Sequence, residues 1–354
     1  MIVVLTSNYD VGVLQLAFQM KKEFRKICGE SVVFVPDQAK LNENENVETY
    51  ERKSSLIPFD KQYDRISKRI MKYNPSLVYV CDSNLITSRI VLGLPKSVPV
   101  CMTVHDVETH PTYNSSLSKI KEMIKRPYTN CALKRANHIV LMSKSSYTKY
   151  KKKRPKYANK LSLIRLGAHV PDVISEQPME IKNATDYILF FGRLDKYKGI
   201  INLLKAYEIG KERINHKIVI AGRGTLTDEE QRLIDKYPKS IILVKRYISD
   251  GEMIWLFENA ACTVLPYIEA SQSGVLSISY YFGKPVIVSD LEGLTEFVEN
   301  GITGAIFHSV DDLSEQLIQV PRIGDTMKEM IYDYYEQNLD WEKSIRSMLA
   351  DLDI

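Results

Sequence analysis

The sequence predicts an α/β protein made of two doubly wound domains, each with a parallel sheet. Short apolar runs rich in β-branched residues alternate with amphipathic segments over residues 1–170, and the pattern starts again over residues 187–322. A length of 354 residues suits two domains better than one. The charge divides as well, with 29 Lys and Arg against 14 Asp and Glu in residues 1–170 and 19 against 30 in residues 171–354. Net charges of +15 and −11 predict a boundary near residue 170.

The first half opens with a short strand at 2–5, a polar loop at 7–12 that contains Gly12, and an amphipathic helix at 13–27. Residues 41–56 are polar and acidic, which predicts a long loop. Further strands are expected at 31–35, 77–80, 98–104, 136–141 and 163–166, and further helices at 63–73 and 118–135.

The second half repeats this alternation after a polar linker at 167–186. Strands are expected at 187–191, 216–221, 241–244, 262–265, 286–288 and 301–307, and helices at 200–209, 228–237, 250–261 and 275–282. The remainder of the chain is predicted to be helical, with one apolar stripe formed by Trp341, Ile345, Met348, Leu349 and Leu352.

The composition excludes several classes of protein. A content of 44% hydrophobic and 26% charged residues is typical of a soluble globular protein. No apolar run approaches the roughly 20 residues that span a bilayer, and the first run is too short for a signal peptide. The five cysteines are scattered without metal-site spacing, so we expect buried thiols in a reducing cytoplasm.

The loop at 266–274 lies between an expected strand and an expected helix. In a parallel sheet such a loop lies at the ligand edge, and here it holds small residues, Ser271, Ser273 and Gly274. Their backbone N–H groups and the positive end of the following helix predict a phosphate cradle. An ordinary strand-to-helix connection explains the same pattern.

A second loop offers cations after the strand at 187–191. Arg193 and Lys198 lie five residues apart across a strand-to-helix turn flanked by glycines. Arg forms a bidentate fork and Lys a point charge, so both could bind one diphosphate. Charges that serve only solubility are the alternative interpretation.

A third candidate site follows the strand at 98–104. His105, Asp106 and His110 stand at its carboxyl end, next to a turn marked by Pro111. Structural hydrogen bonding is the alternative role for each histidine. The spacing does not predict a metal site, because no third ligand is evident.

The densest run of basic residues covers 149–160. It is either solvated surface or a contact with anionic lipid head groups, since each basic residue near such a surface contributes about 1 kcal/mol. Nucleic acid is not expected as a partner, because no RNA- or DNA-binding module surrounds the run.

Four segments in the second half carry a family resemblance. FGRLDKYKG, IVIAGRG, LPYIEASQSGVL and FGKPVIVSDLEGLTEFVENGITG, in this order and spacing, resemble the retaining GT-B glycosyltransferases of family 4, also called glycosyl transferases group 1. The resemblance covers roughly residues 187–310. It is weaker in TVHDVETHP of the first half, and DWEKSI resembles the closing helix of the family.

The resemblance implies a GT-B fold, with two Rossmann-like domains facing a cleft and a C-terminal helix that crosses back to the first domain. Residues 1–170 would bind the acceptor, residues 171–325 would bind a nucleotide sugar, and residues 326–354 would pack back on the first domain. UDP, GDP and ADP sugars are candidate donors. No metal or other cofactor is implied, and no carboxylate pair of the DxD kind stands where a metal would bind.

The resemblance also implies roles for individual residues. His105 would orient the donor sugar or the acceptor, with Asp106 and His110 close to it. The implied diphosphate contacts are Gly12, Arg193, Lys198 and the backbone of Ser273, Gly274 and Val275, and the implied nucleoside contacts are Gly222, Arg223, Gly224, Tyr247 and Ile248.

One departure from the family pattern concerns the ribose. The family often carries two glutamates eight positions apart, and these positions are Ala270 and Ile278 here. The sequence resembles a variant written with Gln-Ser-Gly-Val in this loop. Glu269 or Glu296 would then hold the ribose hydroxyls, and the sequence does not decide between them.

These expectations favour a retaining, metal-independent hexosyltransferase of the cytoplasm. The basic first half predicts an anionic or lipid-linked acceptor, or a polysaccharide precursor, at the cytoplasmic face of a membrane. A non-catalytic GT-B partner subunit is an alternative, because the glutamate pair is missing. A sugar-nucleotide epimerase on the same scaffold is a third hypothesis, disfavoured by the His105 segment and the GRLDKYKG loop.

Overall fold

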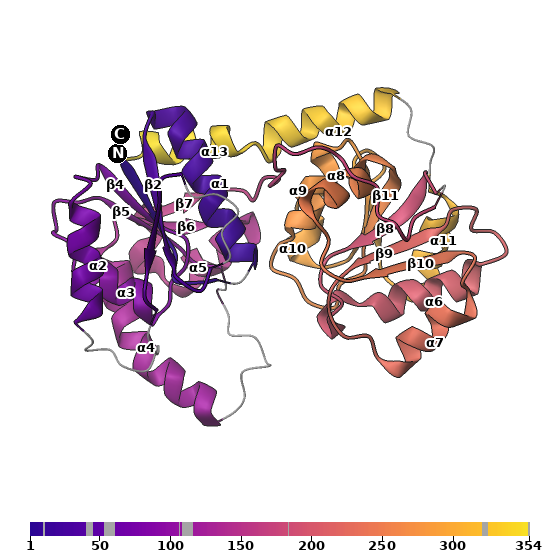
Figure 1. The fold of residues 1–354 in the computed structure, drawn as a ribbon, viewed down its shortest axis with the longest axis horizontal. Helices are drawn as coiled ribbons and strands as arrows, with labels where there is room; N and C mark the ends of the chain where they lie inside the picture. Colours follow the sequence, from indigo (N-terminus) through magenta and orange to yellow (C-terminus); the bar gives the residue numbers. More distant parts are fainter. Residues whose placement is uncertain are drawn as a thin grey trace. The chain divides into compact units, whose positions relative to one another are not determined.

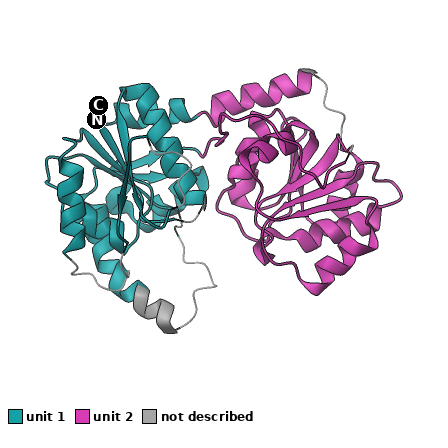
Figure 2. Cartoon of the chain, viewed as in Figure 1, with its two compact units in different colours: residues 1–165, 341–354 teal, residues 166–340 magenta. Residues whose placement is uncertain are grey.

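A computed structural model describes residues 1–9, 11–39, 45–52, 61–105, 107, 116–182, 184–320 and 325–352. The chain forms two compact units, Met1–Arg165 together with Trp341–Ile354, and Leu166–Asp340 (Figure 2). Each unit contains one sheet whose strands are all parallel (Figure 1). Within the described ranges, no helix combines the length and apolar character needed to cross a membrane.

Unit 1 has a seven-stranded sheet in the order β3-β2-β1-β4-β5-β6-β7. The strands are β1 (Ile2–Leu5), β2 (Ser31–Pro36), β3 (Val47–Tyr50), β4 (Leu77–Val80), β5 (Val100–Thr103), β6 (His138–Leu141) and β7 (Leu161–Leu163). The chain moves from β1 outward to β3 and then crosses back to β4, which places the topological switch point between β1 and β4. Ligands of doubly wound sheets bind at such points, outside the carboxyl ends of the strands.

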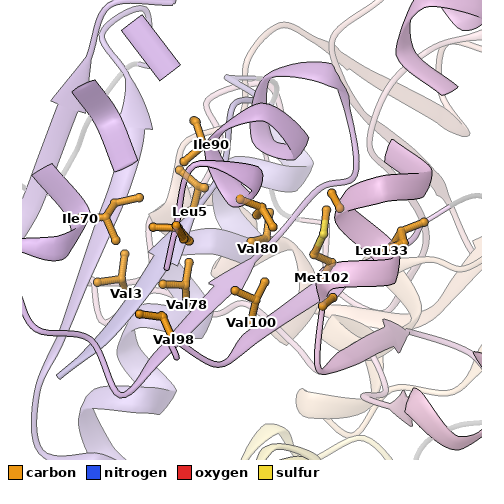
Figure 3. Packing of buried hydrophobic residues seen from close by; sticks show 14 of the residues in the cluster. Val3, Leu5, Ile70, Val78, Val80, Ile90, Val98, Val100, Met102 and Leu133 are labelled. Carbon is orange, nitrogen blue, oxygen red and sulfur yellow. The ribbon is translucent and has the colours of Figure 1, made fainter. Parts of the chain in front are cut away.

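The helices of unit 1 are α1 (Val11–Cys28), α2 (Gln62–Met71), α3 (Leu85–Leu92), α4 (Ser116–Arg135) and α5 (Lys144–Lys153), followed by a 3-10 turn at Pro155–Lys160. Helices α2, α3 and α4 lie side by side. Their side chains meet Val3, Val78 and Val100 of the central strands in one apolar core (Figure 3). The central strands are buried on both faces, which explains their unbroken apolar sequences.

Unit 2 has a six-stranded sheet in the order β10-β9-β8-β11-β12-β13. The strands are β8 (Tyr187–Phe191), β9 (Ile218–Gly222), β10 (Ile241–Lys245), β11 (Ala260–Leu265), β12 (Val286–Ser289) and β13 (Gly304–Phe307). The helices are α6 (Ile200–Gly210), α7 (Asp228–Lys236), α8 (Asp250–Glu258), α9 (Gly274–Tyr281), α10 (Glu292–Thr295), α11 (Val310–Ile318) and α12 (Asp325–Asn338). Its switch point lies between β8 and β11.

The acidic segment predicted to be a loop contains a strand. β3 pairs in parallel with β2, and Tyr50 at its end is buried. The polar side chains are used locally, because Glu48 forms an ion pair with Arg69 and accepts a 2.6 Å hydrogen bond from the hydroxyl of Tyr73. The acidic composition therefore did not reveal this edge strand, whose Glu48 carboxylate binds Arg69 of α2.

Further elements differ from the sequence prediction, including β7, which covers Leu161–Leu163 against the expected 163–166, and α5, which was not predicted. Helix α1 begins at Val11, so Gly12 lies in its first turn rather than in a loop. Helix α3 was not predicted; Asn84 starts it with a capping box, accepting hydrogen bonds from the amides of Ile86 and Thr87. Ala260 begins β11 rather than continuing α8, which ends at Glu258.

The C-terminal segment divides between the two units, whereas residues 326–354 were expected to pack on the first domain as one piece. Helix α12 packs against α9 within unit 2. Helix α13 (Trp341–Ala350) belongs to unit 1, where it packs against α1 and β7. The unit boundaries fall after Arg165 and after Asp340, against the expected 170 and 325.

Helix α13 should be part of the stability of unit 1. Ile345 is fully buried on its packed face, so Ile345→Ala should lower the free energy of unfolding by about 2–4 kcal/mol. Ser347 is exposed on the same helix, and Ser347→Ala is the control, with an expected change within about 0.5 kcal/mol. Urea unfolding of the full chain measures both, and equal effects would show that α13 is not docked.

Candidate functional site

The loop after β8 is shaped by glycines. Gly192 has φ +124° and Gly222 φ +152°, and a Cβ on Gly222 would overlap the carbonyl oxygen of Gly192. The close approach lets the amide of Gly192 donate to Ala221 O at 3.0 Å and the amide of Leu194 donate to Arg223 O at 2.9 Å. The strands β8 and β9 are thereby extended beyond their ends, and Arg193 is held at the carboxyl edge of the sheet.

Arg193 is two-thirds exposed and pairs with one neighbour. Its Nε lies 2.7 Å from Oδ2 of Asp195, with 66% of the Arg193 side chain exposed. An exposed pair of this kind contributes only about 0–1 kcal/mol. Because Asp195 takes Nε, the Nη1 and Nη2 edge of the guanidinium remains available for a second, bidentate anion.

Lys198 is a partly buried cation held by aromatic rings. Its Nζ lies 3.7 Å from the ring centroid of Tyr267 and 5.2 Å from that of Tyr197. In the part of the chain that the structure describes, the ammonium has no hydrogen bond or ion pair. Burial lowers the pKa of Lys198 to about 8; Tyr197 and Asp195 oppose that shift and Arg193 adds to it. Lys198 is therefore a charge with three N–H donors and no acceptor among the described protein groups.

The loops after β8 and β11 are in direct contact at the switch point. Gly199 has φ +65°, and a Cβ there would overlap the carbonyl oxygen of Pro266. Next to this contact, the amide of Ile268 donates to Tyr197 O at 2.8 Å. At the other end of the loop, Gly192 approaches the side chain of Val275, since its Cβ would lie 3.9 Å from Cγ2. Sequence reasoning paired these loops, and the structure brings them together.

Helix α9 begins at this junction. Ser273 precedes it, but the Ser273 side chain forms no capping hydrogen bond; instead its Oγ lies 3.2 Å from the hydroxyl of Tyr267. The amides of the first turn therefore lack a side-chain cap. The helix is fixed by Ser277, which donates to Leu166 O at 2.5 Å, and by Ser279, which donates to Thr263 Oγ1 at 2.8 Å.

The residues expected to contact a nucleoside lie at the same edge. Gly224, at φ +147°, forms an isolated parallel bridge with Leu194, which aligns the loop after β9 with the loop after β8. Arg223 is exposed. Tyr247 is 58% exposed after β10, and Ile248 next to it is half-buried.

Sequence analysis missed the ion network that holds the Tyr247 turn. Arg246 contacts Glu180 at 2.7 Å and Glu252 at 2.7 Å, and its Nη1 donates to Tyr247 O at 3.1 Å. Hydrogen bonds from Arg246 hold the pKa values of both carboxyl groups below their usual range. A lone Arg after a strand gave no signal of this network, because Glu180 is distant in sequence.

The two candidate ribose glutamates have different environments. Glu269 is exposed in the loop after β11, and Glu296 is half-buried directly after α10. The turn that contains Gly293 supports the loop, since a Cβ on Gly293 would lie 2.6 Å from Ala270 O. Ile278, at the usual glutamate position, packs on the apolar core beside α9.

In unit 1, His105 follows β5 and its Nε2 lies 2.7 Å from the carbonyl oxygen of Cys81. A carbonyl only accepts, so Nε2 carries the proton, and Nδ1 would present a lone pair wherever the ring is neutral. Asp106 and His110 lie outside the described residues. Gly12 is exposed in the first turn of α1, with open space where a Cβ would stand.

A buried polar network that the sequence analysis did not find occupies the switch point of unit 1. Oδ2 of Asp82 accepts hydrogen bonds from Thr6 Oγ1 at 2.8 Å and from the Ser7 amide at 3.0 Å. Oδ1 accepts from Asn84 Nδ2 at 3.1 Å. The carboxylate is thus satisfied by the protein, and it fixes the loop that leads to α1. Asp82-Ser-Asn84 directly after β4 was its only sequence signal.

Among the described residues, no group of three or more His, Cys, Asp or Glu side chains is arranged to hold a metal ion.

The fold and the matched family agree. The two parallel-sheet, Rossmann-like domains define the GT-B fold. Residues 174–337 match the family described as "Glycosyl transferases group 1". Two uncharacterized glycosyltransferases of Methanocaldococcus jannaschii are similar, one 30% identical over 118 residues and one 26% identical over 174 residues. The matches span 33% and 45% of this chain, and 30% and 43% of those relatives, so less than half of each relative is covered.

Solved structures are similar over the whole chain. Alr3699/HepE of Anabaena, in complex with UDP, superposes with a TM-score of 0.74 at 15% identity over 99% of both chains. Sucrose-phosphate synthase of Thermosynechococcus elongatus gives a TM-score of 0.70 at 15% identity, over 99% of this chain and 97% of that one. At this identity the likeness shows the fold.

The contact between Gly199 and Pro266 yields a testable expectation. Gly199→Ala should destabilise unit 2 by more than about 2 kcal/mol, because it adds an overlap with a backbone carbonyl to the strain of a positive φ. Gly301 also has a positive φ, +80°, but nothing lies within 4 Å of its Cβ position. Gly301→Ala is therefore the matched control, with an expected cost near 1 kcal/mol. Thermal unfolding of both variants measures the difference, and equal costs would contradict the close approach.

Proposed function

We propose that the protein is a retaining glycosyltransferase that uses a nucleotide-diphosphate sugar as donor. The observation that carries the proposal is the pair of cations at the switch point of unit 2, where Lys198 has no described protein acceptor and Arg193 keeps one edge of its guanidinium open. The uncapped first turn of α9 adds amide donors next to them. A diphosphate supplies the acceptors that these groups lack.

The same groups suit the chemistry of sugar transfer. When the bond between the sugar C1 and the diphosphate oxygen breaks, negative charge develops on the leaving diphosphate. Arg193, Lys198 and the backbone amides of residues 273–275 stabilise that charge in a preorganised way. The acceptor hydroxyl oxygen forms the new bond to C1 on the same face, and its proton goes to the leaving phosphate oxygen. The role of the protein is then positioning and electrostatics, and no metal is needed to neutralise the diphosphate.

The nucleoside would lie along the carboxyl ends of β9 and β10, near Gly222–Gly224, Tyr247 and Ile248. UDP is our first candidate for the nucleotide of the donor, because Alr3699/HepE, which shares the fold, binds UDP and UDP-glucose in its solved complexes. Either Glu269 or Glu296 would bind the ribose. In unit 1, Nδ1 of His105 would accept a hydrogen bond from a sugar hydroxyl.

The first experiment measures binding and turnover together. Thermal shift with UDP, GDP and ADP sugars should show stabilisation by one class of donor. Turnover with that donor should be unchanged by EDTA. Arg193→Ala should lower turnover about 100-fold or more, as does removal of one donor to developing negative charge.

Arg213→Ala is the matched control for that variant, because among the described residues Arg213 pairs only with Glu315, on the exposed surface of the same unit. Its turnover should stay at the wild-type level. Full turnover in Arg193→Ala would overturn the proposed mechanism. Donor binding without slow hydrolysis or transfer would instead indicate a non-catalytic partner subunit.

We propose further that the acceptor is lipid-linked, or a polysaccharide precursor, at an anionic membrane surface. Supporting this, Lys151, Lys152 and Lys156 are exposed on α5 and the turn that follows it. Two other cations of the run at 149–160 bind protein groups instead. Arg154 donates to Asn130 Oδ1 at 3.1 Å, and Lys160 donates to Ala136 O at 2.8 Å.

Vesicle binding tests this contact. Replacing Lys151, Lys152 and Lys156 by Ala should weaken binding to phosphatidylserine-rich vesicles about 100-fold at low salt, at about 1 kcal/mol per cation. The control removes three exposed lysines of unit 2, Lys182, Lys239 and Lys245, and should have little effect. Equal loss in both triple variants, or no binding by the wild-type chain, would exclude a specific membrane face.

A further inference from the structure

The residue after Pro266 has an unusual position for a loop side chain. Tyr267 lies two residues beyond the end of β11 and is only 3% exposed. Its ring packs in the apolar cluster beneath α9, together with Leu276 and Tyr280. Such burial fixes the plane of the ring, so groups that contact its face or its hydroxyl are fixed as well.

Two groups of the proposed diphosphate site contact this one ring. Nζ of Lys198 lies over its face, 3.7 Å from the centroid, which is well within the range of a cation–π interaction. The hydroxyl lies 3.2 Å from Oγ of Ser273, the residue that precedes α9. One side chain therefore joins the loop after β8 to the first turn of the helix after β11.

We propose that Tyr267 is a positioning residue that holds Lys198 through its ring face and Ser273 through its hydroxyl. The inference rests on the proposed function, since it assigns a role within that same site. The inference goes beyond the proposed function because it names the group that holds Lys198 in place without neutralising its charge.

The aromatic face suits this task better than a carboxylate. An acidic partner would form an ion pair with Lys198 and would have to be displaced when an anion binds. The ring stabilises the cation through its quadrupole and leaves all three N–H donors unused. The hydroxyl acts on Ser273 in the same sense, because Oγ is held by Tyr267 and does not cap the amides of α9.

The two contacts can be separated by substitution. Tyr267→Phe keeps the ring face and removes the hydroxyl, whereas Tyr267→Leu removes both. Tyr267→Met is a second aliphatic variant in case the Leu variant does not fold. Tyr197→Leu serves as the comparison, because its ring lies farther from Nζ, at 5.2 Å.

The first readout needs no nucleotide. NMR titration of the Lys198 side chain, assigned with Lys198→Arg, should give the same midpoint for wild type and Tyr267→Phe. The aliphatic variants should titrate lower by about half a unit to one unit, as the ring no longer stabilises the cation. Tyr197→Leu should shift less. Arg193, Asp195 and Tyr197, the other charged or titratable groups that act on Lys198, are intact in the Tyr267 variants. Identical midpoints in all variants would overturn the inference.

The second readout is kinetic and uses the donor found by thermal shift. Tyr267→Leu should lower kcat at least tenfold with a smaller change in KM. A displaced Lys198 would stabilise the transition state less, and this loss is largest when charge develops on the leaving group. Tyr267→Phe should retain kcat within about threefold of wild type but raise KM for the donor a few-fold, because Ser273 is then free to cap the amides that bind the diphosphate. Equal damage in both variants, with a lower kcat and a higher KM in each, would indicate a merely structural role. If wild type binds no nucleotide, the proposed function fails, and the NMR titration still judges the role of Tyr267.

Discussion

The close approach of two backbone segments at Gly199 and Pro266 determines the geometry of the unit 2 site. The loops after β8 and β11 lie on either side of the topological switch point, and they meet only because Gly199 has no side chain and adopts a positive φ. The contact places Lys198 over Tyr267 and aligns the amide of Ile268 with Tyr197 O. The cations of one loop and the helix start of the other thus become parts of one surface.

The two units treat their switch points differently, although both have doubly wound parallel sheets. In unit 1 the position holds Asp82, whose two oxygens accept hydrogen bonds from Thr6, Ser7 and Asn84. In unit 2 the position holds Lys198, which has no described protein acceptor, Arg193, which pairs with Asp195 through Nε, and helix amides without a side-chain cap. A satisfied carboxylate stabilises a loop, whereas unmatched donors favour an anionic ligand. The charges at the two switch points are opposite to the net charges of the halves, because the basic first half holds the carboxylate and the acidic second half holds the cations.

Local sequence patterns predicted what depends on local structure. The apolar runs marked β1, β4, β8 and β11, and glycines beside Arg193 and Lys198 marked the loop that lies at the sheet edge. The patterns failed where a contact between distant segments decides the structure. The sequence did not predict strand β3, because its Glu48 binds Arg69 and Tyr73, which lie 21 and 25 residues further along the chain. Tyr267 read as an ordinary loop residue, and only the fold places it under Lys198.

The lowered pKa of Lys198 means that its buried charge destabilises the fold. Its folded pKa of about 8 lies below the ordinary value of 10.5, so the folded state binds fewer protons between these values. Below pH 8 the charged side chain therefore lowers the stability of the fold, by about 3 kcal/mol at 1.36 kcal/mol per pKa unit, and the penalty is relieved as the pH rises from 8 toward 10.5. A partner carboxylate would remove this cost and also the free donors. The ring of Tyr267 reduces the cost while leaving the charge available, which is the arrangement expected of a cation whose partner is a ligand.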